Sequence, residues 1–395
     1  MNYFHISKKQ LLFDLYVAYE DAARHKKSKP NVVQFSKNLH SNLESICEDL
    51  WNRTYIPRPS TCFIVDHPKK REIFAADFRD RVVHHLYFNY VHQMFENTFI
   101  HDTYSCIQKR GTHFGIKRLK YHIIQESDNY KTECYALKMD IKGYFTNINR
   151  QLLCDIASDA ILKMSARPIS KQNRMKWAEV VDIDLVLYIT KTVALLEPTK
   201  DCIFRCDKSR WIGLANSKSL FHTPEGCGLP IGNLTSQLFS NIFLNILDQY
   251  VKRILKFKHY GRYVDDFYII CQDKRRLHKA ISLIENFLKQ TLDLDINKGK
   301  TKIIDVKYGV EFLGAYIKPR RCYVLNSSLQ RIKHEIYISK YQSTCCINSF
   351  LGILSHYKSF NIRVRLSNII HPKEPGIYND TYTKFKPYSE FKLDG

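Results

Sequence analysis

The sequence predicts an α+β protein in which a small antiparallel sheet is backed by helices. Residues 134–141 alternate along the chain with the two-residue period of a strand, whereas residues 82–95 repeat apolar side chains at helical spacing. Hydrophobic residues make up 44% of the 395 residues and aromatic residues 13%, which is enough to build packed cores. This composition excludes a disordered or collagen-like chain.

The predicted elements follow in order along the chain. Residues 1–60 are expected to be mostly helical until Pro57 and Pro59 break the pattern. The patterns then predict a strand pair at 61–76, a helix at 82–95, a strand at 134–141, helices across 151–196, a long insertion or functional loop at 197–227, a helix at 238–250, a hairpin at 261–271, a helix at 277–290, strands at 302–306 and 310–317, and basic helices at 325–370. The stretch after Ile370 has little periodicity and is expected to be extended or weakly ordered.

The charge balance indicates an anionic partner. Lysine and arginine number 61 against 39 aspartates and glutamates, which gives a formal net charge of +22. Nucleic acid is the commonest such partner, and the interleaved tyrosines and phenylalanines suit a groove that stacks bases. The alternative is a basic protein without a nucleic-acid role. The sequence shows no apolar run of about 18 residues and no secretory signal, so a cytoplasmic protein without a membrane anchor is expected.

The twelve cysteines have no regular spacing, so reduced thiols are expected. Ligand type and separation would allow zinc to be held by a group of four residues, Cys202, Cys206, His222 and Cys227. The alternative is a set of unrelated thiols, because the first pair lies in a polar, loop-like stretch. The sequence leaves both interpretations open.

The sharpest local feature is the run YVDD at residues 263–266, at the expected turn of a hairpin. Its adjacent carboxylates, Asp265 and Asp266, repel each other unless a cation lies between them. Asp140 ends the strand at 134–141 and could meet this hairpin across a sheet. Three carboxylates can hold two Mg²⁺ ions about 4 Å apart, which activate an attacking 3′-oxygen and stabilise a leaving pyrophosphate. A solvated acidic turn with an unrelated Asp140 is the alternative.

These residues resemble the palm of a reverse transcriptase, and the resemblance covers most of residues 60–318. The segment LKMDIKGYFTNI, residues 137–148, is similar to the first palm motif, and YVDD is similar to the catalytic hairpin. The resemblance implies a right-hand polymerase fold with fingers, a palm and a helical thumb. It also implies that Asp140, Asp265 and Asp266 are catalytic and bind two Mg²⁺ ions, together with the backbone carbonyl of Ile141.

The domains implied by the resemblance divide the chain into four parts. They are N-terminal helices and fingers at 1–134, a palm at 135–318 with an insertion near 197–227, a helical thumb at 319–370 and a C-terminal tail at 371–395.

Further residues are assigned by the resemblance to the incoming nucleotide. Lys70-Arg71 resembles the fingers motif, where the planar guanidinium of Arg71 would lie on the triphosphate, and Lys300 resembles the lysine that reaches the triphosphate. Phe145 stands where the family places the ring that excludes a ribose 2′-OH. Each has a simpler interpretation, with Arg71 and Lys300 as surface charges and Phe145 as a core aromatic.

The segment at 226–248 best discriminates between groups of reverse transcriptases. Its glycines and Pro230 shape a loop where backbone can approach a nucleotide or a template. Most reverse transcriptases carry Gln at the position of Ile231, and Ser-Pro at the position of Ser236-Gln237. This departure resembles the reverse transcriptases of diversity-generating retroelements, which copy RNA with errors at adenines. Ile231 lacks the hydrogen bond that a Gln could make to the nucleotide, although Ile231 could simply pack the loop.

The expected binding residues fall into two groups. The nucleotide-binding group is Lys70, Arg71, Phe145, Ile231, Gly232 and Lys300; the template or primer group is Gly228, Pro230, Ser236, Gln237, Phe312 and Gly314. Phe312 and Gly314 resemble the turn that grips the primer, and a strand core with a bend is the alternative.

The resemblance therefore implies an RNA-directed DNA polymerase that makes cDNA from dNTPs on an RNA template, with looser checking of the nascent base pair at Ile231. An error-prone enzyme of the diversity-generating type is expected, bacterial or phage-encoded, with a structured noncoding RNA and a small basic accessory protein as partners. An antiphage-defence reverse transcriptase that copies a dedicated noncoding RNA is the alternative. Phe145 argues against an RNA-dependent RNA polymerase, and the three aspartates argue against a catalytically inactive RNA-binding protein.

Overall fold

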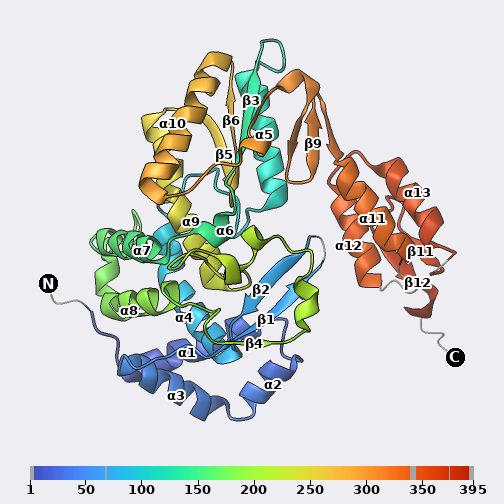
Figure 1. The fold of residues 1–395 in the computed structure, drawn as a ribbon. Coiled ribbons are helices and arrows are strands. Elements are labelled where there is room, and N and C mark those ends of the chain that lie inside the picture. Colours follow the sequence, from blue (N-terminus) through green and yellow to red (C-terminus); the bar gives the residue numbers. More distant parts are fainter. Residues whose placement is uncertain (1–3, 67–68, 339–343, 373, 391–395) are drawn as a thin grey trace.

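The computed structural model describes residues 4–66, 69–338, 344–372 and 374–390. At its centre lies a four-stranded antiparallel sheet in the order β5-β6-β3-β7 (Figure 1). The strands are β3 (Tyr135–Asp140), β5 (His259–Tyr263), β6 (Asp266–Cys271) and β7 (Lys302–Asp305). The predicted α+β class is confirmed.

Helices cover both faces of this sheet, which explains why β6 is apolar along most of its length. Phe267 and Ile269 face one core, which they share with α9 (Leu234–Gln249) and α10 (Lys274–Leu292). Tyr268 and Ile270 face the other core, which they share with α5 (Thr112–Glu126). Successive side chains of a strand point to opposite faces, so each face takes every second residue.

The N-terminal residues pack together with residues 150–204 below the four-stranded sheet in Figure 1. Helix α4 is the centre of this part and contacts both α1 and α9. The helices here are α1 (Lys8–Ala23), α2 (Pro30–Ser36), α3 (Leu39–Trp51), α4 (Phe78–Glu96), α7 (Arg150–Ser165) and α8 (Ile183–Ala194). A second sheet has the order β2-β1-β4 and consists of β1 (Ser60–Val65), β2 (Arg71–Ala75) and β4 (Cys202–Phe204).

The 197–227 segment, expected to be an insertion or loop, is attached to this second sheet. Its strand β4 pairs in parallel with β1. The buried carboxylate of Glu72 on β2 accepts hydrogen bonds from Trp211 Nε1 at 2.6 Å and Ser219 Oγ at 2.8 Å. It also accepts one from the backbone N–H of Leu220 at 2.6 Å. The segment therefore packs on the β1–β2 sheet. Its position in the sequence, within the expected palm at 135–318, instead suggests an association with the four-stranded sheet.

The C-terminal residues form a helical unit with a core of its own, at the right of Figure 1. Between it and the central sheet lies a third sheet of β8 (Val310–Phe312), β9 (Ala315–Lys318) and β10 (Arg321–Val324). The unit contains α11 (Asn326–Ile338), α12 (Thr344–Ser355) and α13 (Phe360–Ile370), and a two-stranded sheet of β11 (Gly376–Tyr378) and β12 (Phe385–Pro387).

The two-stranded sheet differs from the extended or weakly ordered tail that the sequence predicts after Ile370. Asn348 on α12 ties β12 in place, since its side chain bonds both the N–H of Phe385 at 2.7 Å and the carbonyl of Phe385 at 2.9 Å. Strands of three residues are too short to show a period. The last part of the predicted tail, 391–395, lies outside the described residues.

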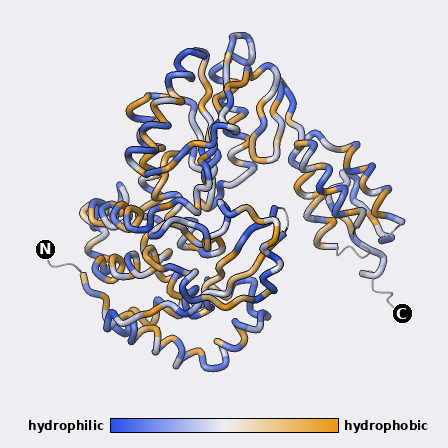
Figure 2. Tube along the Cα trace, in the orientation of Figure 1, coloured by the Kyte–Doolittle hydropathy of each residue, from blue (hydrophilic) through white to orange (hydrophobic). Residues whose placement is uncertain are grey.

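Apolar and polar stretches alternate along the whole trace in Figure 2. Within the described part of the chain, no helix combines the length and the apolar character needed to cross a membrane.

Candidate active site

Three carboxylates meet at one end of the β3–β6 strand pair. Asp140 is the last residue of β3, and Asp266 is the first residue of β6 and its direct partner across the antiparallel ladder. Asp265 lies in the turn between β5 and β6, next to Val264, whose φ is +56°. The antiparallel register thus brings together the residues that the sequence places 125 and more positions apart.

The charges at this site are crowded. Burial, together with the charge of Asp140, raises the pKa of Asp265 to about 6. Burial also raises the pKa of Asp266, an effect that Lys138 opposes and Asp140 adds to. Lys300 donates to Asp140 Oδ2 at 2.9 Å, and Lys138 Nζ lies 3.7 Å from Asp266 Oδ1. The negative charge is therefore only partly balanced by these two lysines.

Among the residues that the structure describes, no group of three or more His, Cys, Asp or Glu is arranged as a ready metal site. The zinc candidates Cys202, Cys206, His222 and Cys227 are thus not gathered around a common point, although each of them is described. The three aspartates, which are described as well, do not form such a ready group either, but their chemistry differs from that of the zinc candidates. They offer the oxygen donors that Mg²⁺ prefers, and their mutual repulsion is what a cation would relieve. On this ground the aspartates fit a divalent cation.

The predicted loop after residue 226 lies between the end of β3 and the second sheet. The N–H of Leu229 donates to the carbonyl of Phe145 at 2.7 Å, and the N–H of Phe74 donates to the carbonyl of Ile231 at 3.1 Å. Phe145 is in the short helix α6 (Tyr144–Asn147), which follows Asp140. The backbone of the loop therefore joins α6 to β2 beside the carboxylates.

Gly232 is required in this loop by both conformation and space. Its φ is +125°, and a Cβ at this position would lie 2.9 Å from Ile73 Cγ2. Gly228 also has a positive φ, +101°, and its N–H donates to the carbonyl of Ile148 at 2.9 Å. The close approach of loop and strand β2 thus depends on glycine.

The expected nucleotide-binding side chains occupy different environments. Phe145 and Ile231 are both half-buried, and Arg71 is exposed at the start of β2. Lys70 donates to the carbonyl of Ile212 at 2.7 Å, so it is engaged with the 197–227 segment. Lys300 lies on Asp140, as described above, and is the expected binding residue found directly at the carboxylates.

Most of the side chains expected to contact template or primer are buried and support the local backbone. Pro230 and Ser236 are buried, whereas Gln237 is exposed. The ring of Phe312 is 1% exposed and packs edge-on against Tyr268, with ring centroids 5.1 Å apart. Gly314, with a φ of +84°, forms the β8–β9 turn, and its carbonyl accepts from the N–H of Leu325 at 2.9 Å. Phe312 therefore packs inside the core beneath the β8–β9 turn, and its ring is not exposed to solvent.

Two residues near the carboxylates were not found from the sequence. Asn297 donates its backbone N–H to the carbonyl of Asp140 at 2.7 Å and its side-chain N–H to Asp140 Oδ2 at 3.2 Å. No pattern links it to Asp140. Lys138, by contrast, stands two positions before Asp140 in the strand, and the period of two could have placed both on one face.

Comparisons with known proteins place the chain in a family. The model of the family "Reverse transcriptase (RNA-dependent DNA polymerase)" matches residues 64–317, which is more than half of the chain. Protein YkfC of Escherichia coli (strain K12) is 24% identical over 319 residues, covering 72% of this chain and 73% of that protein.

Two solved structures of telomerase are similar at lower identity. The telomerase of Candida albicans, in complex with a TWJ fragment of telomeric RNA, is 10% identical with a TM-score of 0.48, covering 81% of this chain and 54% of that chain. The apo telomerase of Candida tropicalis, truncated from the C-terminal domain, is 12% identical with a TM-score of 0.44, covering 66% and 53%. The chain spans about half the length of these two telomerase chains.

Proposed function

The chain belongs to the reverse transcriptase (RNA-dependent DNA polymerase) family. We propose that it synthesises DNA on an RNA template with the carboxylates of Asp140, Asp265 and Asp266. As a member of the family it is an enzyme, an RNA-directed DNA polymerase with the right-hand polymerase fold. The observation that carries the proposal is the pairing of Asp140 with Asp266 across the ladder, with Asp265 beside them in the turn.

The carboxylates and the backbone carbonyl of Ile141 would hold two Mg²⁺ ions. When bound, these ions would activate the 3′-oxygen of the growing strand and neutralise the leaving pyrophosphate. Lys300 and Lys138 balance part of the carboxylate charge in their absence. Lys300 is 63% exposed, so its long side chain can leave Asp140 and reach an incoming triphosphate.

The incoming nucleotide would bind between Asp140 and the loop at 228–232. Half-buried Phe145 and Ile231 would border its sugar and base, and the backbone of Gly232 would lie close because it carries no side chain. Lys70 and Arg71 stand near the start of β2 and would contact the triphosphate from the side of the second sheet.

The template and primer would be held by backbone more than by exposed side chains. Gly228 and Gly314 have positive φ angles that permit close approach, and Pro230, Ser236 and Phe312 support the loop and turn from within. Gln237 is the exposed member of this group. The net charge of +22 supports binding to the phosphates of an RNA template and a cDNA product.

We propose an error-prone enzyme of the diversity-generating type, acting in the cytoplasm on a structured noncoding RNA with a small basic accessory protein. Ile231 supports this role, because it removes a polar contact to the incoming nucleotide. An antiphage-defence reverse transcriptase that copies a dedicated noncoding RNA shares the same palm residues and is the second candidate.

Primer extension tests the proposed activity. The full chain should incorporate dNTPs on an RNA template in the presence of Mg²⁺, and should do so poorly with rNTPs or without a template. Incorporation of rNTPs as fast as dNTPs would indicate an RNA polymerase, and RNA binding without any synthesis would indicate an inactive binding protein. Sequencing of the cDNA separates the two roles, since errors concentrated opposite adenines favour the diversity-generating type and faithful copies favour defence.

A further inference from the structure

Val264, which precedes the proposed metal ligand Asp265, has an unfavourable backbone conformation. Its φ of +56° lies in the left-handed region, where a β-branched residue is a rare outlier. Such a conformation persists only where the surroundings hold it. Because Asp265 is the next residue, whatever holds the Val264 peptide also sets the direction of the Asp265 carboxylate.

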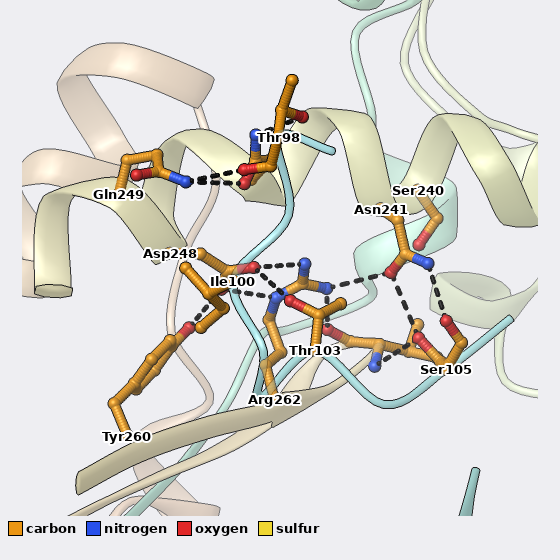
Figure 3. Close-up of polar contacts among 12 residues, drawn as sticks. Thr98, Ile100, Thr103, Ser105, Ser240, Asn241, Asp248, Gln249, Tyr260 and Arg262 are labelled. Atoms are coloured by element: carbon orange, nitrogen blue, oxygen red, sulfur yellow. Dashed lines mark hydrogen bonds and ion pairs between the residues drawn. The ribbon is translucent and has the colours of Figure 1, made fainter. Parts of the chain in front are cut away.

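Both backbone polar groups of Val264 are held by hydrogen bonds. Its N–H donates to Ser105 Oγ at 3.2 Å, and its carbonyl accepts from Arg262 Nη1 at 3.0 Å. The two side chains come from distant parts of the chain, since Arg262 is on β5 and Ser105 is in the segment that follows α4. Figure 3 shows Ser105 and Arg262 within one network of polar contacts.

Arg262 is itself fixed by a buried ion pair with Asp248 on α9. Its Nε donates to Asp248 Oδ1 and its Nη2 to Asp248 Oδ2, each at 2.7 Å, and both side chains are 0% exposed. Asp248 also accepts from the hydroxyl of Tyr260 at 2.6 Å and that of Thr103 at 3.0 Å. This two-pronged pairing with Asp248, drawn in Figure 3, leaves Nη1 of the guanidinium to donate to the Val264 carbonyl.

Ser105 is fixed from the same helix. Its hydroxyl donates to Asn241 Oδ1 at 3.1 Å, and Asn241 Nδ2 donates back to the carbonyl of Ser105 at 2.8 Å. Asn241 and Asp248 are seven residues apart on α9, so they share one face of that helix. Both supports of the Val264 peptide therefore end on α9, which begins directly after the loop at 228–232.

We propose that Arg262 and Ser105 are positioning residues, which transmit the placement of α9 to the Val264 peptide and so aim the Asp265 carboxylate into the site. The proposal rests on the proposed function of Asp265. A buried ion pair adds little net stability over well-packed apolar side chains, so stability alone does not account for it. Arg262 Nη1, which takes no part in the ion pair, donates to the Val264 carbonyl, and this contact gives the ion pair a role at the hairpin.

Ser105→Ala and Ser127→Ala form a matched pair for the test, because each removes one buried serine hydroxyl that accepts from a backbone N–H. The Ser105 hydroxyl accepts from Val264, whereas the Ser127 hydroxyl accepts from Tyr130, outside the network around Arg262. The first readout is the kcat of dNTP incorporation. The second is the dissociation constant of Mn²⁺ alone, titrated by electron paramagnetic resonance without nucleotide, because a misdirected Asp265 weakens the metal site directly. Thermal unfolding shows whether each full-length variant is folded.

Ser105→Ala should lower kcat and weaken Mn²⁺ binding, each by about three- to tenfold, the effect of one lost hydrogen bond to the part-buried N–H of Val264. Ser127→Ala should stay within about twofold of wild type in both, because its hydroxyl lies outside this network. Arg262→Lys keeps the charge but loses the planar fork, so it should exceed the loss in Ser105→Ala. If Arg262→Lys does not fold, Ser105→Ala still decides.

Equal losses in Ser105→Ala and Ser127→Ala would overturn the proposal, since the loss of a buried serine hydroxyl would then act only through stability. Wild-type behaviour of Ser105→Ala would overturn it as well. If the wild-type protein itself made no DNA, the proposed function would fail, whereas the ratio of Mn²⁺ affinities would still decide whether these residues position Asp265.

Discussion

Glu72→Gln should loosen the attachment of the 197–227 segment to the β1–β2 sheet. The Glu72 side chain is 3% exposed and accepts from Trp211 Nε1, Ser219 Oγ and the N–H of Leu220. Glutamine has the same shape but replaces one acceptor oxygen with an NH₂ group. Whichever way the amide is turned, at least one of these donors then faces another donor.

The magnitude follows from the cost of an unpaired buried group, which is about 1–3 kcal/mol. A loss of about 2 kcal/mol in the free energy of local opening corresponds to about thirtyfold faster exchange of the protected amides. Hydrogen exchange measured on peptides from 205–222 is the assay, and the N–H of Leu220 is the most direct probe because it donates to Glu72 Oε1.

Glu225→Gln is the control, since Glu225 belongs to the same segment but is exposed. It should leave the exchange of 205–222 unchanged. Unaltered exchange in Glu72→Gln would refute the reasoning, because the segment would then be held by the β1–β4 pairing and its apolar contacts instead.

Three further predictions concern the proposed reaction. Phe145→Ala should raise rNTP incorporation relative to dNTP by about five- to 160-fold, the range expected when a steric clash of about 1–3 kcal/mol is removed, and unchanged discrimination would make Phe145 a core aromatic. Ile231→Gln should lower misincorporation by about two- to tenfold, most visibly opposite template adenines, and identical error spectra in sequenced cDNA would remove Ile231 from the fidelity argument. The affinity for structured RNA should fall with salt at a log–log slope of about −0.7 to −0.9 per phosphate contacted, and a flat response would mean that the charge of +22 does not bind RNA.

Much of the central fold could be predicted because its periods are clear. The alternation at 134–141 corresponds to β3, the helical spacing at 82–95 lies within α4, and the YVDD run falls at the β5–β6 turn. The meeting of Asp140 with this hairpin could be anticipated as well. Adjacent carboxylates at strand ends repel one another unless a cation lies between them, so a third carboxylate nearby indicates a shared cation site.

Other features depend on contacts between distant residues that no local pattern encodes. Glu72 and Trp211 are 139 positions apart, and their hydrogen bond assigns the 197–227 segment to the second sheet. Arg262 and Asp248 read locally as one charge on a strand and one on a helix, and only the fold buries them as a pair. The β11–β12 strands have three residues each, so tertiary contacts such as those of Asn348 decide their structure.

The rate of a single dNTP addition on an RNA template tests the central claim most directly. Asp265→Asn should reduce this rate by at least about a thousandfold while RNA binding and thermal unfolding stay close to wild type, because a lost metal ligand removes several kcal/mol of transition-state stabilisation. Asp293→Asn is the matched control, since Asp293 is 71% exposed and its φ of +50° suits asparagine. Wild-type rates in Asp293→Asn with a collapsed rate in Asp265→Asn are the predicted result; appreciable DNA synthesis by purified Asp265→Asn would contradict the account.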